Sequence, residues 1–292
     1  MQWINAEIKK RKPKAFTIAE DLRDNPVIVK RQEDGGAGFA TQWDARFVHP
    51  VRQALIGADD LNRNMDSVRD AVLHRFYLNA FERVIYTESH DEVANGRARV
   101  PEEVAPGNAA NWFAKKKSCI GAVLVFTSPG IPMIFQGQEF LEDDWFHDKD
   151  PIDWTKKDRF AGILQLYRDL IRLRLNSEGF TKGLCGQEVN VFHVNNTDKV
   201  LGFHRWDKGG PGDSVVVVVN FANQSHTDYV IGFPHEGIWK VRFNSDAKVY
   251  DPEFGDFPCP DVTAEKGERD GLPYRGKIHI APYSCLILSG NK

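Results

Sequence analysis

The sequence has 292 residues, of which 41% are hydrophobic and 27% charged, and its net charge is −3. This composition is typical of a folded globular protein, and the length allows two domains or one large barrel. The small negative charge excludes a general attraction to nucleic acid or anionic membranes, and the longest apolar block, residues 215–219, is only strand-sized. We therefore expect a cytoplasmic protein that binds neither nucleic acid nor membrane.

The four cysteines are far apart in the sequence and form no paired motif. Such spacing suits neither a zinc site nor a disulfide framework, so we expect reduced, buried thiols. We predict that the protein uses no cofactor and no metal ion. The cysteines are Cys119, Cys185, Cys259 and Cys285.

The first predicted element is a short helix at the N-terminus. Trp3, Ile4 and Ile8 are spaced as one apolar stripe, and a basic turn followed by Pro13 ends the pattern. No capping residue precedes the stripe, so the sequence begins inside the pattern. We therefore expect the chain to be a fragment of a longer protein.

Three short apolar runs each end abruptly in acidic or amide side chains. They lie within residues 15–22, 81–92 and 130–140. In parallel α/β folds the carboxyl ends of the strands carry the side chains that meet a ligand. Segments with helical periodicity separate the runs, so we interpret the pattern as a catalytic rim rather than as unrelated polar loops. Its polar members are Glu20, Asp21, Glu88, His90, Asp91, Glu92, Gln138 and Glu139.

The intervening segments predict helices and one weak strand. Their periodicity indicates helices at residues 46–56, 65–76, 109–127 and 160–175, and a weak strand at residues 39–44. This strand–helix region ends near residue 180, whereas a complete (β/α)₈ barrel needs about 250 residues. The region is therefore either a small open α/β domain or half of a barrel.

Two local patterns in this region could have a function. The glycines of residues 35–38 allow tight turns, and no nucleotide-binding glycine motif surrounds them, so we discard a phosphate cradle. The three consecutive lysines at residues 115–117 favour a solvated helix face over a binding site.

From about residue 189 the apolar period changes to two. Seven short alternating runs follow, separated by Gly, Pro, Asn and Asp, and this pattern predicts an antiparallel β-sandwich. Its aromatic residues, Trp206 and Trp239 among them, fit a core better than a sugar-binding platform. The runs are residues 189–194, 199–206, 214–221, 228–233, 237–244, 276–283 and 285–289.

Four motifs, in this order, resemble the second half of the α-amylase clan of glycoside hydrolases. They are FTIAEDL, GGAGFATQWD, YTESHDEV and GIPMIFQGQEF. The resemblance is closest to 1,4-α-glucan branching enzymes. It implies an α/β plus all-β fold, in which residues 1–180 form the C-terminal half of the (β/α)₈ catalytic barrel. Residues 181–292 then form the all-β C-terminal β-sandwich domain.

The resemblance also implies roles for individual residues. Glu20 matches the general acid/base, and Asp91 matches the carboxylate that binds sugar hydroxyls and stabilises an oxocarbenium-like state. His90 matches a substrate-binding neighbour of that carboxylate, and Trp43 is expected to bind substrate as well. Asp21 is interpreted as a turn or salt-bridge residue, and Gln138 and Glu139 as mainly structural.

The sequence departs from the clan in one important respect. A retaining glycosidase needs a carboxylate nucleophile in addition to the acid/base. In the clan this nucleophile lies in a segment of the type Gly-Phe-Arg-x-Asp, and the sequence contains no such segment. We therefore expect a branching-type transglycosylase, acting in glycogen or starch metabolism, that is inactive as an isolated chain.

Two alternatives remain open. One is an amylase-type or trehalose-releasing hydrolase of the same clan, and the other is a non-catalytic protein that binds glucan or acts as a scaffold. The expected partners are an α-1,4-glucan (glycogen, starch or maltooligosaccharides) and the missing N-terminal half of the barrel. Open sheet edges also predict self-association.

The motif order makes a geometric prediction. Glu20 ends one strand and Asp91 ends the next but one, so both side chains point to the same end of the sheet. Since neighbouring strands are about 4.8 Å apart, we expect the two carboxylates within about 10 Å, with His90 nearby. Unrelated surface acids would lie on different faces or well over about 15 Å apart.

Overall fold

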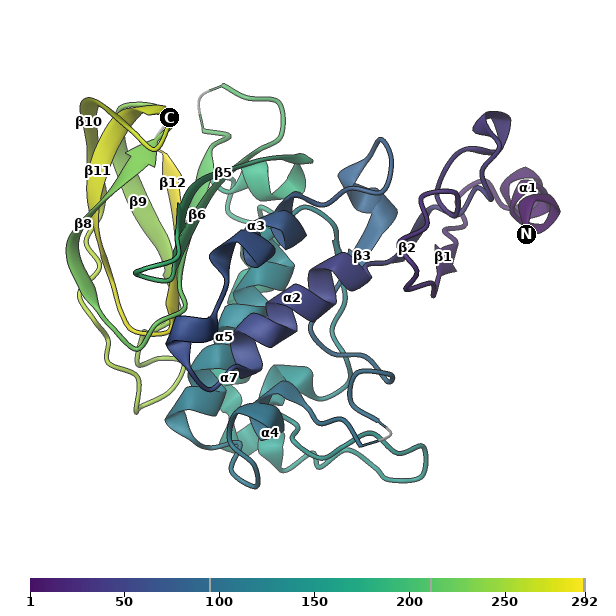
Figure 1. The fold of residues 1–292 in the computed structure, drawn as a ribbon, viewed down its shortest axis with the longest axis horizontal. Coiled ribbons are helices and arrows are strands. Elements are labelled where there is room, and N and C mark those ends of the chain that lie inside the picture. The colour runs from purple at the N-terminus through teal and green to yellow at the C-terminus, as the bar shows by residue number, and fades with distance from the viewer. Residues whose placement is uncertain (95, 211, 291–292) are drawn as a thin grey trace.

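A computed structural model describes residues 1–94, 96–210 and 212–290. It contains two sheets with helices between them (Figure 1). The smaller sheet is parallel, with strand order β1-β2-β3-β4, and the larger is antiparallel with eight strands. The parallel strands are β1 (Ile18–Ala19), β2 (Thr41–Trp43), β3 (Arg83–Ile85) and β4 (Ile131–Pro132).

The four helices that periodicity predicted between the strands and after them are confirmed. Side-chain caps explain three of the starts, because Asp44, Asn64 and Asn111 each accept a hydrogen bond from a backbone amide of the first turn. The helix predicted at residues 65–76 ends three residues early, at Leu73. The helices are α1 (Gln2–Arg11), α2 (Ala45–Ile56), α3 (Met65–Leu73), α4 (Val100–Val104), α5 (Trp112–Thr127), α6 (Lys156–Arg159) and α7 (Ala161–Arg174).

None of these helices, across the described residues, has the length and apolar character needed to cross a membrane. Short 3₁₀ helices occupy Gln32–Asp34, Asp60–Asn62, Ala80–Glu82, Gln138–Phe140 and Lys182–Cys185.

The parallel sheet is short and open. Its outer strands, β1 and β4, each have a partner on one side only, as the predicted motif order requires. Helices α2, α3, α5 and α7 lie between this sheet and the antiparallel one (Figure 1). The α/β part of the predicted fold is therefore observed as a four-stranded sheet with helices.

The antiparallel β-sandwich predicted for the C-terminal region is confirmed. All seven predicted runs are strands, and the strand order is β5-β6-β7-β12-β9-β10-β11-β8. The prediction missed β10, in which only Val262 and Ala264 are buried, so its sequence carries little period-two signal. The strands are β5 (Glu188–Asn195), β6 (Val200–Trp206), β7 (Val215–Asn220), β8 (His226–Phe233), β9 (Gly237–Asn244), β10 (Val262–Arg269), β11 (Leu272–Ile280) and β12 (Ser284–Gly290).

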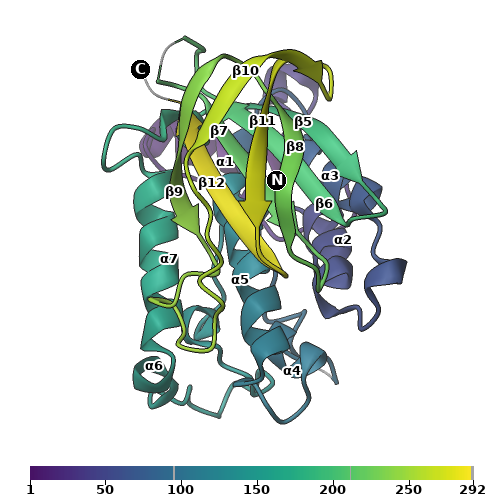
Figure 2. The ribbon, with the colours of Figure 1, turned by 90° about the vertical axis from the view of Figure 1, so that its left-hand side faces the viewer.

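Strand β7 shows how the two parts share a core. Its five valines, residues 215–219, are all fully buried. Val216 and Val218 point into the interior of the sandwich. Val217 and its neighbours on the same face pack in a second cluster with residues of α5 and α7. Figure 2 shows the sandwich in front of these two helices. A continuous apolar strand is the expected sequence for a sheet that is covered on both faces.

The prediction of a solvated face at residues 115–117 is wrong. The side chains of Lys115, Lys116 and Lys117 are 5% exposed or less. Lys115 pairs with Asp251 and Glu253, and Lys116 Nζ lies 2.6 Å from Asp246 Oδ1. The cause is tertiary: α5 packs under the sandwich, acids that follow β9 in the sequence neutralise Lys115 and Lys116, and the Lys117 ammonium donates to the Gly57 carbonyl.

Helix α1 forms as predicted, but its apolar side faces outward. Trp3 is 77% exposed. The polar side makes the contacts instead, because the Gln2 and Asn5 side-chain amides donate hydrogen bonds to the Gly36 and Ala37 carbonyls at 2.9 and 2.8 Å. Together with β1, this helix lies at one end of the molecule, far from the sandwich (Figure 1). Gly36 is required there, because a Cβ would lie 2.0 Å from the Lys30 carbonyl oxygen.

The four cysteines are free. Cys119 and Cys285 are buried as expected, whereas Cys185 is exposed. Burial raises the pKa of the Cys119 thiol to about 12, so this group is inert as a nucleophile near neutral pH.

Lys117 gives the stability of the fold a predicted pH dependence. Burial, and secondly the Arg63 guanidinium, lower the pKa of Lys117 from 10.5 to about 8. Between these two values the unfolded chain holds a proton that the folded chain has released, so stability should rise with pH. We expect the free energy of unfolding of wild type, minus that of Lys117→Met, to increase between pH 8 and 10.5. Below pH 8 this difference should stay constant. Urea unfolding of both proteins across this range measures the gain, and a flat difference would contradict it.

Candidate active site

Glu20 follows β1 directly, at the carboxyl end of the parallel sheet. Its side chain is 48% exposed. The next residue forms a turn, since Asp21 Oδ1 accepts a hydrogen bond from the Arg23 amide at 2.9 Å, which confirms its predicted role. Asp24 then ties this loop to α2 and to the end of α3 through ion pairs with Arg46 and His74. The loop that carries Glu20 is therefore anchored a few residues beyond it.

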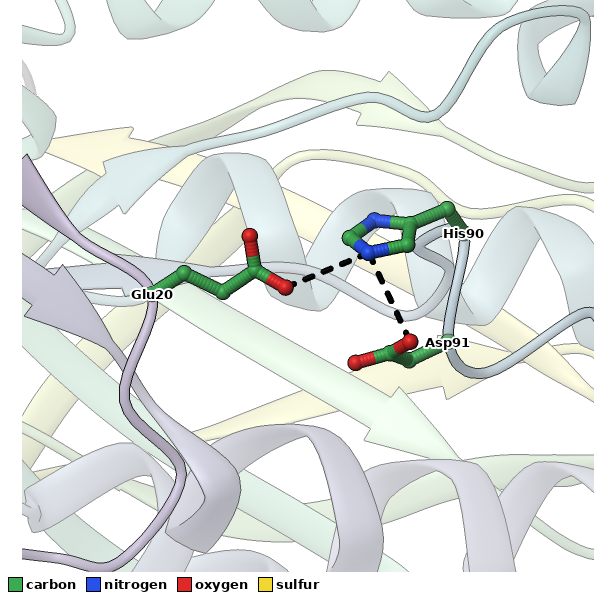
Figure 3. Close-up of side chains that lie close together, drawn as sticks. All are labelled: Glu20, His90 and Asp91. Atoms are coloured by element: carbon green, nitrogen blue, oxygen red, sulfur yellow. Dashed lines mark ion pairs between the residues drawn. The ribbon is translucent and has the colours of Figure 1, made fainter.

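The structure brings Glu20, His90 and Asp91 together (Figure 3). His90 Nε2 lies 3.2 Å from Glu20 Oε1 and 3.4 Å from Asp91 Oδ1. The ligand atoms of the three side chains all lie within 4.8 Å of one another. The prediction that the two carboxylates lie within about 10 Å, with His90 nearby, is confirmed. The roles assigned to these residues stay predictions.

Buried charges hold the turn that carries His90 and Asp91. Glu92 is buried, and its carboxylate faces His49, Arg52 and Arg97 at 3.2, 3.7 and 3.5 Å. On the other side of the turn, the buried pair Glu88–Arg99 has an N–O distance of 3.2 Å. Removing one partner of a buried pair leaves an uncompensated charge, so these contacts fix the turn strongly. The sequence placed Glu88 and Glu92 on the rim but gave no sign that they act as buried supports.

Two aromatic rings line the base of the cluster. The Trp43 ring, on β2, lies 5.7 Å from the His90 ring and 5.2 Å from the Tyr86 ring, edge to face in both cases. Trp43 thus restricts the position of the imidazole, and its predicted contact with substrate stays a prediction. Tyr86 is fully buried, and its hydroxyl has no hydrogen-bond partner among the described residues. Burial first, and then nearby carboxylates that include Glu92 and Asp91, raise the pKa of Tyr86 well above its ordinary value.

The motif after β4 supports the rim. Gln138 Nε2 donates to Thr87 Oγ1 at 2.5 Å, and Gln138 Oε1 accepts from the Phe135 amide at 3.2 Å. The bond to Thr87 joins the segment after β4 to the segment after β3, and the bond from Phe135 orients the Gln138 amide. This is the structural role that the sequence predicted for Gln138.

Two side-chain groups among the described residues have the spacing of metal ligands. One is the cluster of Glu20, His90 and Asp91. The other is the run of three acids at residues 142–144, into which the Lys156 ammonium donates two hydrogen bonds. In the second group the ammonium thus supplies the positive charge that a cation would bring.

The cluster can transfer protons and stabilise positive charge. One carboxylate can donate or accept a proton at a glycosidic oxygen, while a second faces the developing charge on the sugar. An imidazole between them can donate a hydrogen bond to either carboxylate or to a sugar hydroxyl. The cluster is also open to a substrate, because the side chains of Glu20 and Asp91 are about half exposed.

Comparisons with known proteins show which sequences this chain is similar to. Residues 192–291 match the family described as the alpha amylase C-terminal all-beta domain. Over 295 residues, 97% of this chain, the sequence is 28% identical to the 1,4-alpha-glucan branching enzyme GlgB of Corynebacterium diphtheriae, of which 38% is covered. The enzyme of the same name from Rhodopseudomonas palustris (strain HaA2) is 29% identical over 252 residues, which cover 85% of this chain and 34% of that protein.

Solved structures share the fold. A pullulanase from Anoxybacillus sp. LM18-11, complexed with maltotriose, matches 99% of this chain and 40% of its own with a TM-score of 0.67 and 18% identity. A debranching enzyme from Nostoc punctiforme matches 99% of this chain and 54% of its own, with a TM-score of 0.66 and 16% identity.

The resemblance to the α-amylase clan is confirmed. The matches to clan members extend over nearly the whole described chain rather than over the C-terminal domain alone. The chain spans about two fifths of the length of the curated branching enzymes it matches.

Proposed function

We propose that this chain carries the acid/base and charge-stabilising half of an active site for retaining transfer on α-1,4-glucans, of the branching type. The observation that carries the proposal is the convergence of Glu20, His90 and Asp91 at the carboxyl end of β1 and β3. The similarity to branching enzymes along 97% of the chain supports this reaction class over others.

In this proposal each side chain has one task. Glu20 protonates the leaving glycosidic oxygen and then takes a proton from the acceptor sugar hydroxyl. Asp91 binds sugar hydroxyls and stabilises the positive charge that develops on the sugar ring. His90 lies within reach of both carboxylates and donates a hydrogen bond to the substrate. Trp43 limits the motion of that imidazole and offers an aromatic face to a sugar.

We further propose that the parallel sheet is the second half of a (β/α)₈ barrel in residues 1–180, followed by the sandwich domain in residues 181–292. The parallel order of β1 to β4, with the helices α2, α3, α5 and α7 on one side, supports this arrangement. The nucleophile would then come from a polypeptide segment that pairs with the open edges of β1 and β4. A second copy of this chain is another partner that those edges could recruit.

Binding of maltoheptaose tests the proposed site without requiring turnover. We expect His90→Ala to weaken binding at this site about tenfold, because a hydrogen bond to an aligned sugar hydroxyl and the ordering of two carboxylates are both lost. Asp91→Asn should also weaken the binding of maltoheptaose at this site. Isothermal titration calorimetry measures the affinities, and Asp228→Asn, at an exposed aspartate of the sandwich, is the matched control. Unchanged affinity in both site variants would contradict the proposed site.

A further inference from the structure

One groove lies outside the candidate active site, at the open end of the β-sandwich. It has a volume of about 470 Å³, within the range of small-ligand sites. Its lining comes from the end of β6, from the start of β7 and from the turn between β8 and β9. The lining residues are His204, Trp206, Gly209, Gly210, Ser214, Pro234 and His235.

Two stacked pairs of rings form part of the groove. On β6 the His204 and Trp206 rings stack at 4.7 Å between centroids, 23° from parallel. Beside β9, a strand of the same sheet, the His235 ring stacks on Trp239 at 4.4 Å and 24°. Trp239 itself is fully buried, whereas Trp206 and His235 are only partly buried. The groove therefore presents flat aromatic surface that is fixed from behind.

Hydrogen bonds hold this lining in place. The His204 Nε2 atom lies 3.0 Å from Ser214 Oγ. The Asp213 carboxylate accepts the backbone amides of Asp207, Lys208 and Gly209, and so fixes the loop beside the groove. A Cβ at Gly290 would lie 2.3 Å from His235 Cε1, so a glycine there makes room for the ring.

The described lining residues carry imidazole, indole and hydroxyl groups and no permanently charged side chain. Burial, and next the His235 imidazole, lower the pKa of His204 to about 4, so that its ring is neutral near pH 7. The other polar groups of the lining are the Ser214 hydroxyl, the His235 imidazole and the Trp206 indole N–H. Among the residues that the structure describes, no acidic, lysine or arginine side chain lines the groove. An ionic ligand would find no permanent counter-charge among these described residues, whereas a sugar would find aromatic faces and hydrogen-bonding groups.

We propose that this groove is a second α-glucan-binding site, separate from the Glu20–His90–Asp91 cluster, which holds a glucan chain by stacking a glucose ring on Trp206. The choice of an α-glucan rests on the proposed function of the chain, since a polymeric substrate can contact the protein at two places. The sequence had favoured a core role for the aromatic residues of the sandwich. Trp239 is a fully buried core residue, whereas Trp206 is only partly buried.

Maltoheptaose titrations of single-site variants test this inference. We expect Trp206→Ala to weaken maltoheptaose binding at this site about tenfold and Trp206→Phe to retain most of it, because phenylalanine keeps an aromatic face. The NMR signals of the His204 and His235 imidazoles should shift on addition of maltoheptaose. Trp3→Ala removes an exposed tryptophan at the other end of the molecule and is the control. His235→Ala is a second groove variant, should Trp206→Ala fail to fold.

The two proposed sites can fail independently. If Trp206→Ala and His235→Ala fold and bind maltoheptaose as wild type does, or if the two imidazole signals do not shift, the second site is wrong. This conclusion on the second site would not depend on the maltoheptaose affinity of Asp91→Asn. If Trp206→Ala weakens binding while Asp91→Asn has no effect, the second site is supported and the candidate active site is contradicted.

Discussion

The purified chain is expected to show no branching or cleavage of amylose. Double displacement on a glycoside needs a carboxylate nucleophile as well as an acid/base, and the sequence contains no match to the clan's nucleophile segment. Loss of one member of a catalytic unit typically costs several orders of magnitude, up to about 10⁶ in rate. Iodine staining and reducing-end assays on amylose, sensitive to single turnovers, measure this.

Activity should appear when the complementary part is supplied. A polypeptide that carries the Gly-Phe-Arg-x-Asp segment of a branching enzyme can pair with the open edges of β1 and β4, which offer unpaired backbone groups. We expect the mixture to branch amylose, and Glu20→Gln to abolish that activity while Asp228→Asn leaves it unchanged.

One outcome would change the assignment of roles. The nearest oxygens of Glu20 and Asp91 lie within 4.8 Å, which is also compatible with the acid/base and nucleophile of a retaining enzyme, whose carboxyls are about 5–5.5 Å apart. If the chain alone cleaves amylose, and a glycosyl group is found bound covalently to Asp91, then Asp91 is the nucleophile. The half-site proposal would then be wrong.

The candidate site could be predicted because its residues follow a rule that acts locally. Each short apolar run forms a strand, and the polar residue after it must lie at the strand's carboxyl end. Glu20 and Asp91 therefore meet wherever β1 and β3 share a sheet with β2 between them. The valine run of β7 was equally clear, because continuous β-branched residues favour a strand that is buried on both faces.

The contacts between distant segments could not be predicted in this way. Lys116 reads as a surface residue because its partner, Asp246, is 130 residues away. The same holds for Arg52, which supports the turn of Asp91 through Glu92. A charged side chain normally lies in solvent unless a counter-charge reaches it. For Lys116, only the packing of α5 against the sandwich supplies that counter-charge. Strand β10 was missed for a related reason, since its pairing with β9 and β11 outweighs its polar sequence.

Removal of the Lys116 ammonium should destabilise the whole chain. Lys116 Nζ lies 2.6 Å from Asp246 Oδ1, with side chains that are 0% and 2% exposed. Asp246 also accepts the amides of Gly255 and Phe257, so it holds the segment that leads from β9 to β10. In Lys116→Met the Asp246 carboxylate would stay buried without its cation, at a cost of roughly 3–5 kcal/mol.

Urea unfolding of four proteins separates this pair from simple loss of packing. We expect Lys116→Met to lose roughly 3 kcal/mol or more, and the double variant with Asp246→Asn to recover part of that loss, since two neutral side chains leave no buried charge. Lys248→Met, at an exposed lysine two residues from Asp246, should stay within about 0.5 kcal/mol of wild type. If Lys116→Met unfolds as wild type does, the pair contributes nothing, and the packing of α5 against the sandwich rests on the apolar cluster around β7 and β12 alone. A large loss with no recovery in the double variant would instead assign the effect to the contacts of the Lys116 ammonium with the Trp112 and Phe254 rings, whose centroids lie 5.7 and 4.8 Å from it.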